Sequence, residues 1–469
     1  MKRRLGVIAA LLVIAAACGA RVSDSQRLAA QGVGGAAGPG DAASADGSAP
    51  GVSGSPVGGA AAAPAEGPSA AGTNAGAATQ GAPAASGDNG GSTDVGVTGT
   101  TITMGTVATL SGPIPGLFQG AAIGAQAFAA YINSQGGIGG RKLKIDVVDD
   151  QFDTGQNRAA VNDLSHKALG FLGSFSTFDD AGGADMQANG VPDIGYGLTD
   201  ARRTSTVNFS PQPGKSGTFR TGPFEYYAKK FPDAVKAMGS IYGDIPASKG
   251  GAVDSMAAAQ SVGWKFVYVR GAQPTETDFT ADVIRMKAAG VKGFYTVATD
   301  PKSMARILLA MQQQNFHPEF VGFGASAYDP QLTGLAGDAA NGVWVDQQLA
   351  MYAGGDSAAI PEVALMNQWV QKVKPGFTPD LYTAFSWASG RMLQQALAAT
   401  GPRVTRKGLL AALAKIDNFD ANGLLAPSGP GTKKQATCDM FMRIDHGKYV
   451  RQDPAGKGFL CIGHMFPHG

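Results

Sequence analysis

From Thr101 onward, the sequence alternates short runs rich in β-branched and aromatic residues with longer runs of helical spacing, and this alternation restricts the possible folds most strongly. Such an alternation is typical of a parallel β-sheet covered by helices, which defines the α/β class. The pattern occurs in two successive series, so we predict two α/β domains. The predicted strands are 102–109, 143–148, 171–173 and 193–195 in the first series, and 239–242, 265–269, 293–297, 320–323 and 343–345 in the second.

The predicted helices occupy the stretches between these strands and continue beyond the second series. They are 117–133, 156–168, one between 173 and 193, 249–261, 279–289, 301–314 and 331–335, followed by 361–372, 381–399 and 405–413. Two further strands, around 440–444 and 448–450, are expected to close the folded region.

The first quarter of the chain lacks the large side chains from which a core is built. No Phe, Tyr or Trp precedes Phe118, and 47 of the 60 residues in 31–90 are Ala, Gly, Ser or Pro, with no Lys or Arg among them. A segment of this composition buries too little apolar surface to offset the entropy lost on ordering. We therefore predict a disordered linker at 19–95 and a folded part of about 374 residues, enough for two lobes.

The N-terminus has the features of an export signal. Lys2, Arg3 and Arg4 precede an apolar run that is too short to span a bilayer. Small residues lead directly into Cys18 and resemble the lipobox of bacterial lipoproteins. This resemblance implies that 1–18 hold the signal peptide with the lipidated Cys18, and that the chain is extracytoplasmic and anchored to the outer face of the cell membrane. The alternative is an ordinary signal peptide that contains a cysteine.

The charge balance indicates no polyanionic partner. The chain has 38 Lys and Arg against 36 Asp and Glu, a net charge of +2, and no basic cluster occurs beyond the N-terminus. Nucleic-acid binding is therefore not expected.

Two cysteines remain beyond the signal region, Cys438 and Cys461, 23 positions apart. In an oxidising compartment they are most simply explained by a disulfide. Metal binding is the alternative, because Cys461 lies close to His464 and His468. The Gly and Pro of this last segment do not suit a helical ligand pair, and zinc sites generally use four ligands at tight, repeated spacing.

No motif for catalysis is found. The sequence contains neither G-x-S-x-G nor H-E-x-x-H. Gly214, Lys215 and Ser216 match the end of a phosphate-binding loop, but Phe209 stands where its first glycine belongs. We read Asp149 and Asp150 as a polar strand end with one acid capping the next turn. We therefore expect a non-enzymatic binding protein with no catalytic residue, cofactor or metal.

Three loops that follow predicted strands combine hydroxyl side chains with glycine. They contain Ser111, then Ser174, Ser176 and Thr177, and then Gly197 and Thr199. Ligands of open α/β sheets bind at the carboxyl ends of the strands, so these loops are candidates for a ligand pocket. The alternative for each hydroxyl is that it only caps the following helix.

Several segments resemble periplasmic-binding-protein type I solute receptors of the branched-chain amino acid (Leu/Ile/Val) class. The resemblance is carried by Leu110–Pro113, by 131–143 with its Gly-Gly-Ile-Gly-Gly-Arg run, and by Val148–Gln151. In the second series it is carried by 277–290 and 335–343. It covers essentially all of residues 98–453.

The resemblance implies two Rossmann-like lobes joined by three crossover strands, which close on a small solute and deliver it to an ABC permease. Lobe 1 would contain 98–222 plus 352–425, and lobe 2 would contain 223–351 plus 426–469. In amino-acid-binding members the ligand carboxylate is held by hydroxyls and backbone amides of two loops. This role would fall on Ser176, Thr177 and Thr199. We expect a monomer that works next to the membrane.

The sequence departs from the amino-acid binders at two positions. The acid that holds the ammonium group is absent after the strand at 320–323, where no acid occurs before Asp329, and 243–248 lacks the usual aromatic residue. A buried ammonium without a carboxylate partner is costly. Aromatic residues near strand ends (Phe175, Phe178, Tyr196, Phe323 and Tyr328) instead suggest a more apolar or aromatic ligand, although core packing is the alternative for Phe323.

The predicted ligand-binding residues are Ser111, Ser174, Ser176, Thr177, Tyr196, Gly197, Thr199, Tyr328 and Asp329. The predicted function is that of an extracytoplasmic solute-binding lipoprotein of an ABC-type uptake system. Its ligand would be amino-acid-like or more apolar. The alternative function is a ligand sensor or adaptor of the same fold that signals to a membrane partner.

Overall fold

The computed structural model describes residues 89–297 and 299–468, which belong to one compact unit. The predicted signal peptide, Cys18 and most of the predicted linker lie outside the described residues. The last linker positions, 89–95, are described and are hydrogen-bonded to the folded part. The Arg141 guanidinium donates to the carbonyl of Gly91 at 3.1 Å, and Asp94 accepts from the backbone N–H of Arg406 at 2.8 Å. Folded structure therefore begins several residues before the predicted boundary.

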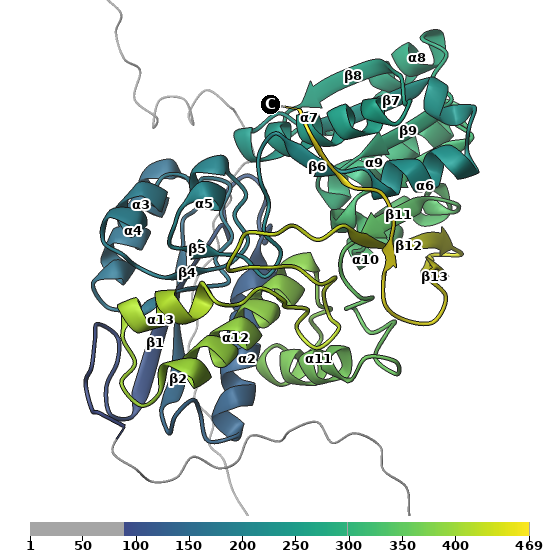
Figure 1. Cartoon of the computed structure of the whole chain (residues 1–469). Coiled ribbons are helices and arrows are strands. Elements are labelled where there is room, and N and C mark those ends of the chain that lie inside the picture. Colours follow the sequence, from purple (N-terminus) through teal and green to yellow (C-terminus); the bar gives the residue numbers. More distant parts are fainter. Residues whose placement is uncertain (1–88, 298, 469) are drawn as a thin grey trace, which may run out of the picture. The chain divides into compact units, whose positions relative to one another are not determined.

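The first sheet has five parallel strands in the order β2-β1-β3-β4-β5 (Figure 1). β1 lies between β2 and β3 and is almost completely buried along its second half, so it forms the buried centre of the sheet. The strands are β1 (Thr101–Ala108), β2 (Lys142–Asp149), β3 (Gly170–Leu172), β4 (Asp193–Ile194) and β5 (Asn208–Phe209). The intervening helices are α2 (Gln119–Ser134), α3 (Thr154–Ser165), α4 (Gly183–Ala188) and α5 (Asp200–Thr204).

Three later helices pack beside this first sheet, although they follow the second series in the sequence. They are α11 (Pro361–Val373), α12 (Leu381–Thr400) and α13 (Arg406–Leu413). The axes of α12 and α2 approach closely because glycine stands at the contact. A Cβ atom on Gly390 would lie 2.2 Å from Cγ of Phe128. Asp380 begins α12 with a capping box, in which its carboxylate accepts from the backbone N–H of Thr383 at 2.8 Å.

The second sheet has the strand order β13-β12-β11-β10-β9-β7-β8, with β14 paired to β12. Strands β7 to β11 run parallel, whereas β12 and β13 are antiparallel additions from the C-terminal part. The parallel strands are β7 (Met238–Gly243), β8 (Phe266–Ala272), β9 (Gly293–Thr296), β10 (Phe320–Phe323) and β11 (Trp344–Gln347). The added strands are β12 (Cys438–Asp445), β13 (Lys448–Asp453) and β14 (Leu460–Cys461).

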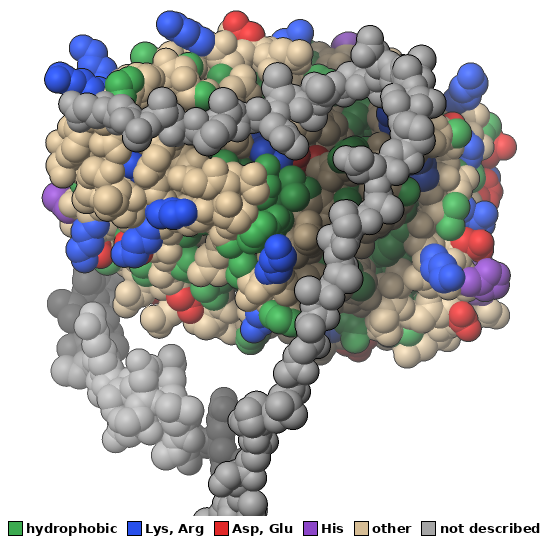
Figure 2. Space-filling model, turned by 90° about the horizontal axis from the view of Figure 1, so that it is seen from below, with side chains coloured by type: hydrophobic (Ala, Val, Ile, Leu, Met, Phe, Trp, Pro, Cys, Tyr) green, Lys and Arg blue, Asp and Glu red, His purple; other side chains and the backbone are tan. Residues whose placement is uncertain are grey.

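Helices and turns complete this second layer. The helices are α6 (Gly222–Lys230), α7 (Pro246–Ser261), α8 (Thr280–Ala288), α9 (Pro301–Gln313) and α10 (Pro330–Ala336), and the 3-10 turns are η1 (Ala234–Lys236), η2 (Ala325–Ala327) and η3 (Gly337–Ala340). Within the described residues, no helix is both long and apolar enough to cross a membrane. Lys and Arg side chains are dispersed over the face seen in Figure 2.

The sequence predicted every strand of five or more residues and all helices except α5 and α6. The unpredicted strands are β5, β6 (Thr218–Arg220), β14 and β15 (Met465–Pro467). Each of these four strands has only two or three residues, too few to show a periodic pattern. The α/β class with two lobes is confirmed.

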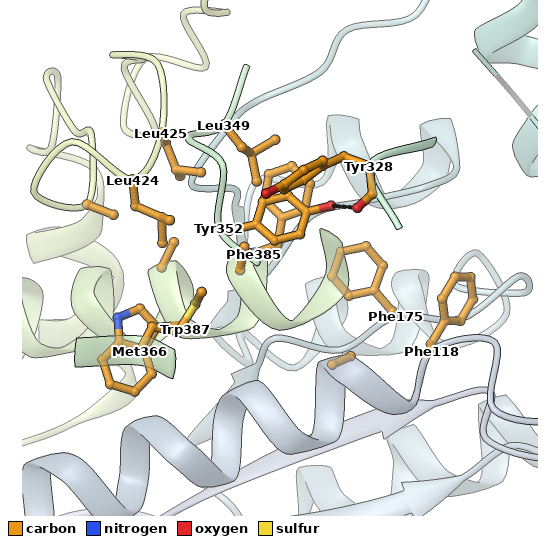
Figure 3. Close-up of a cluster of buried hydrophobic side chains, with 14 of the residues drawn as sticks. Phe118, Phe175, Tyr328, Leu349, Tyr352, Met366, Phe385, Trp387, Leu424 and Leu425 are labelled. Carbon is orange, nitrogen blue, oxygen red and sulfur yellow. Dashed lines mark hydrogen bonds between the residues drawn. The ribbon is translucent and has the colours of Figure 1, made fainter. Parts of the chain in front are cut away.

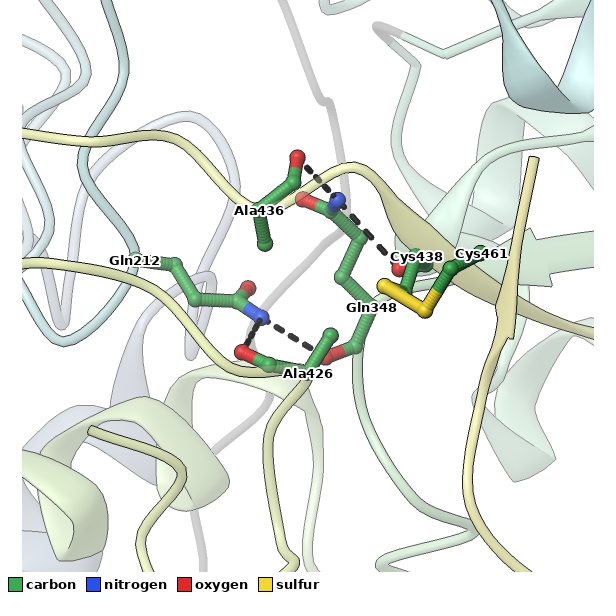
Figure 4. Close-up of a disulfide and its surroundings, with 6 residues drawn as sticks. All are labelled: Gln212, Gln348, Ala426, Ala436, Cys438 and Cys461. Carbon is green, nitrogen blue, oxygen red and sulfur yellow. Dashed lines mark hydrogen bonds between the residues drawn. A yellow bond between two sulfur atoms is a disulfide. The ribbon is translucent and has the colours of Figure 1, made fainter. Parts of the chain in front are cut away.

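Three connecting segments run between the two sheets and are hydrogen-bonded to one another (Figure 4). The Gln212 side-chain amide donates to the carbonyl of Gln348 at 2.7 Å, and the Gln348 amide donates to the carbonyl of Ala436 at 2.8 Å. Leu349 and Leu425 form a backbone bridge between the second and third segments. The connections therefore form one small network.

Cys438 and Cys461 form the predicted disulfide, which joins β12 to β14 (Figure 4). Beyond it, β15 pairs antiparallel with β6, so the disulfide is followed by a segment that lies against residues 218–220. The described residues hold no cluster of three or more His, Cys, Asp or Glu side chains suited to a metal ion.

We expect the Cys461→Ser variant, made in a Cys18→Ser background, to lose about 2–4 kcal/mol of unfolding free energy, because a cross-link over 23 positions restricts the unfolded chain. Urea denaturation measures the loss. A thiol assay on the unfolded, unreduced Cys18→Ser protein provides the control, and two reactive thiols in that assay would contradict the disulfide.

Candidate functional site

A cavity of about 320 Å³ lies at the carboxyl ends of strands from both sheets. From the first series it is bordered by Phe118 after β1, by Thr177 after β3 and by Tyr196 after β4. From the second series it is bordered by Ile245 after β7 and by Thr299 after β9. This is the position at which open α/β sheets bind ligands, and the volume suits a small organic molecule.

One side of the cavity is formed by five aromatic side chains, Phe118, Phe175, Tyr196, Tyr382 and Phe385, which we call the aromatic wall. Tyr196 stacks on Phe385 with ring centroids 4.9 Å apart, and Tyr382 contacts Phe118 and Phe175 edge-on at 4.6 and 5.0 Å. Figure 3 shows Phe118, Phe175 and Phe385 beside the apolar core that continues behind the wall. The wall is therefore held in place by mutual ring contacts and gives this side of the cavity an apolar lining.

The side of the cavity formed by the second series has polar groups that are already hydrogen-bonded within the protein. The Thr299 hydroxyl donates to the carbonyl of Ile241 at 3.0 Å, and the Ser326 hydroxyl donates to the carbonyl of Thr299 at 3.0 Å. Asp300 caps α9 and accepts from the backbone N–H groups of Lys302 and Ser303. Ile241, Ile245, Val297 and Phe279 provide apolar surface between these groups.

Thr177 borders the cavity and differs from these residues because its hydroxyl has no partner. The residue is 4% exposed, and its Oγ1 makes no hydrogen bond in the described part of the chain. Buried hydroxyls are normally hydrogen-bonded, and leaving one unpaired is costly. Thr177 thus brings an unpaired hydroxyl to the edge of the cavity.

Among the residues that the structure describes, three cationic side chains also border the cavity. Arg203 donates to the carbonyls of Gly197 and Leu198 at 2.9 and 2.7 Å, and Lys215 is exposed. Arg220 lies between two fully buried acids, at 2.6 Å from Asp439 and 3.4 Å from Asp346. Two buried carboxylates thus share one guanidinium, and burial raises the pKa of Asp346 to about 7.

We expect this cluster to make the protein less stable as the pH rises. The folded-state pKa of Asp346 lies above its ordinary value of 3.8, so the folded protein binds more protons than the unfolded chain between about pH 4 and pH 7. The free energy of unfolding should then fall through this window, by at most about 1.4 kcal/mol per pH unit. In Asp439→Asn, Asp346 has Arg220 to itself and the slope should flatten. Urea denaturation across the pH range tests this, and identical slopes in the two proteins would contradict it.

Of the nine predicted ligand-binding residues, Thr177 and Tyr196 border the cavity. The hydroxyls of the first-sheet loops are used inside the protein. Ser111 donates to Asp149 at 2.5 Å, Ser176 donates to Asp150, and Thr199 donates to Asp179. Ser174 Oγ accepts from the backbone N–H of Val107 at 3.0 Å.

The remaining predicted residues, Gly197, Tyr328 and Asp329, are also placed away from the cavity lining. Gly197 is a buried residue of the loop after β4. Tyr328 packs edge-on against Tyr352 and Tyr449, with both ring separations at 4.8 Å. Asp329 caps α10 by accepting from the backbone N–H of Gln331 at 2.7 Å, and burial raises the pKa of its carboxyl. Phe323 is fully buried in the core.

The sequence did not identify Phe118, Tyr382 and Phe385 as lining residues, because at helical spacing they cannot be distinguished from core positions. Lys215 was noticed only as part of an incomplete phosphate-loop motif. Its nearness to the cavity depends on how the first connecting segment folds back.

A cavity between strand ends of two α/β sheets, with connecting segments beside it, defines a two-lobed solute-binding protein. In agreement, the family model described as periplasmic binding protein matches residues 101–448, and the chain belongs to this family. The family consists of non-enzymatic, extracytoplasmic proteins that bind small molecules and work with ABC permeases. The predicted family and the absence of enzymatic activity are confirmed.

Individual relatives agree with this assignment. A Leu/Ile/Val-binding protein homolog 1 of Brucella suis biovar 1 (strain 1330) is 29% identical over 294 residues, which are 61% of this chain and 76% of the relative. A fatty acid ABC transporter substrate-binding protein from Thermomonospora curvata has a TM-score of 0.68 at 19% identity, over 81% of this chain and 97% of that structure. A branched chain amino acid ABC transporter from Thermus thermophilus with bound valine has a TM-score of 0.66 at 17% identity, over 79% and 97%. The two structural similarities show the fold alone.

Proposed function

We propose that the protein is an extracytoplasmic lipoprotein, anchored through Cys18, that captures a small organic solute with a large apolar part and delivers it to an ABC permease. Residues 19–88 would serve as the tether. Lobe 1 (98–222 plus 352–425) and lobe 2 (223–351 plus 426–469) would close around the solute. The packing of α12 on α2 and the addition of β12 to the second sheet support this division.

The aromatic wall is the observation that carries the proposed ligand class. Five mutually packed rings border the cavity, and each apolar Å² that a solute buries there contributes about 25 cal/mol. One structurally similar protein is described as a fatty acid binder and another holds valine. The wall favours an apolar or aromatic body over a compact amino acid.

The carboxylates near the cavity support the same choice. Among the described residues that line it, the acids are Asp254 and Asp300. Asp254 Oδ1 lies 2.7 Å from Nε2 of His468, and Asp300 is occupied as a helix cap. An amino acid's ammonium group would have to compete for these acids. We propose that Tyr196 contacts the apolar body and that Thr177 Oγ1 bonds the polar group, while the other predicted loop residues shape the site.

Thermal-shift measurements on the purified protein test this function, with leucine, valine, octanoate, 4-phenylbutanoate and 4-phenylbutanamide as probes. We expect the apolar probes to stabilise the protein, and leucine and valine to have little effect. A probe that binds adds about 2.7 kcal/mol to the free energy of unfolding when its concentration is 100 times its Kd. Stabilisation by leucine or valine alone would refute the proposed ligand class. Membrane fractionation of the wild type and Cys18→Ser tests the anchor, and equal membrane association would exclude it.

A further inference from the structure

We propose that Asp179 is a specificity-determining residue, whose carboxylate takes up the hydrogen-bond donors of the loop at 196–199 and so leaves this loop with an apolar face toward the cavity. The proposal rests on the proposed function, since it concerns the ligand class accepted by the same cavity. It reverses the expectation that this loop holds a ligand carboxylate.

Three donors of the loop converge on Asp179. The backbone N–H of Leu198 donates to its Oδ2 at 2.6 Å, and the backbone N–H of Thr199 donates to its Oδ1 at 3.0 Å. The Thr199 hydroxyl also donates to Oδ1. Asp179 is 5% exposed and does not border the cavity, so these donors point into the protein. A solute carboxylate in the cavity meets a loop whose donors are already occupied by a carboxylate of the chain itself.

Arg202 fixes this arrangement from behind. Its side chain is 2% exposed and forms a two-point ion pair with Asp193, at 2.7 and 2.8 Å. Its Nη1 also donates to the carbonyls of Ser174 and Tyr196 at 3.0 and 3.2 Å and lies 3.5 Å from Asp179. One guanidinium thus holds the loops after β3 and β4. Asp179 holds the loop after β4 through the backbone N–H groups of Leu198 and Thr199.

The consequence is a chemical preference at this end of the cavity. The loop presents the Tyr196 ring and Leu198 to the cavity, both of which border it. Asp179 is paired with Arg202, so the preference comes from the occupied donors and not from repulsion by its charge. Solutes that turn an apolar or neutral group toward this loop should therefore bind better than carboxylates placed in the same way.

Asp179→Ala tests the proposal in two measurements. The variant leaves the three donors and Arg202 facing a space the size of a carboxylate. We expect its melting temperature to fall by about 5 °C or more, and formate to restore part of the loss. We also expect the ratio of affinities for 4-phenylbutanamide over 4-phenylbutanoate to fall about tenfold relative to the wild type, because the positive charge of Arg202 is then less offset and the loop donors have lost their internal acceptor. Asp180→Ala, which removes a neighbouring exposed carboxylate, is the matched control and should change neither property.

An unchanged affinity ratio in Asp179→Ala would overturn the specificity role, and a formate effect equal to that in Asp180→Ala would overturn the internal carboxylate. If neither probe binds the wild type, the proposed ligand class fails, while formate rescue still decides whether Asp179 fills the donors. Should Asp179→Ala not fold, Asp179→Asn keeps the side-chain volume and removes the charge. Its affinity ratio must also fall, and formate should not stabilise it.

Discussion

Replacing Tyr196 by alanine is expected to weaken the binding of apolar solutes by about 10- to 100-fold while the protein stays folded. Tyr196 is half-buried and stacks on Phe385 at 4.9 Å, and its ring borders the cavity. Contact with a bound solute would bury much of the ring, and burying an aromatic side chain is worth about 1.5–3 kcal/mol. A difference of 1.4 kcal/mol changes an affinity tenfold. Isothermal titration with 4-phenylbutanamide measures the loss.

The matched control is Tyr196→Phe, which keeps the ring and removes the hydroxyl. It should bind within a few-fold of the wild type, because the wall contributes apolar surface rather than a hydrogen bond at this position. Thermal unfolding without ligand separates a local effect from loss of the fold. Equal affinity of Tyr196→Ala and the wild type would show that the solute lies elsewhere in the cavity or that the cavity is not the site.

The sequence could predict the fold because the periodic pattern of each long element agrees with its place in the sheets. The strand predicted at 320–323 is β10, and the helix predicted at 381–399 differs from α12 by one residue. The connecting segments were harder, since β5 and β6 contain only two and three residues. Their positions follow from contacts with segments more than 100 positions away, such as that of Gln212 with Gln348.

The site was predictable only in part, because the type of a residue does not show which partner its side chain selects. Ser176 and Thr177 are adjacent, yet Ser176 bonds Asp150, 26 positions earlier, whereas Thr177 faces the cavity. Thr199 likewise bonds Asp179, 20 positions earlier. A loop with hydroxyls at a strand end therefore indicates the region that a ligand approaches, while the acids behind the loop decide which hydrogen-bond donors the ligand meets there.

Replacing Arg202 by methionine is expected to lower the free energy of unfolding by about 3–5 kcal/mol. The guanidinium is 2% exposed and compensates Asp193 and Asp179, whose side chains are 1% and 4% exposed. Methionine fills similar space but leaves these two acids without their cation, and the cost of a buried uncompensated charge exceeds the worth of the pair itself. The carbonyls of Ser174 and Tyr196 would also lose their shared donor. Urea denaturation at neutral pH measures the change.

Arg158→Met is the matched control, because it breaks an ion pair with Asp185 in which the two side chains are 67% and 34% exposed. Exposed pairs contribute about 0–1 kcal/mol, since water and salt screen them, so this variant should remain close to the wild type. A similar loss in both variants would mean that burial does not set the strength of the Arg202 cluster. Arg202 joins the loops after β3 and β4. Arg202→Met should therefore also loosen the packing of the Tyr196 ring against its neighbours. The stability of the first sheet and the shape of the aromatic wall thus depend on the same guanidinium.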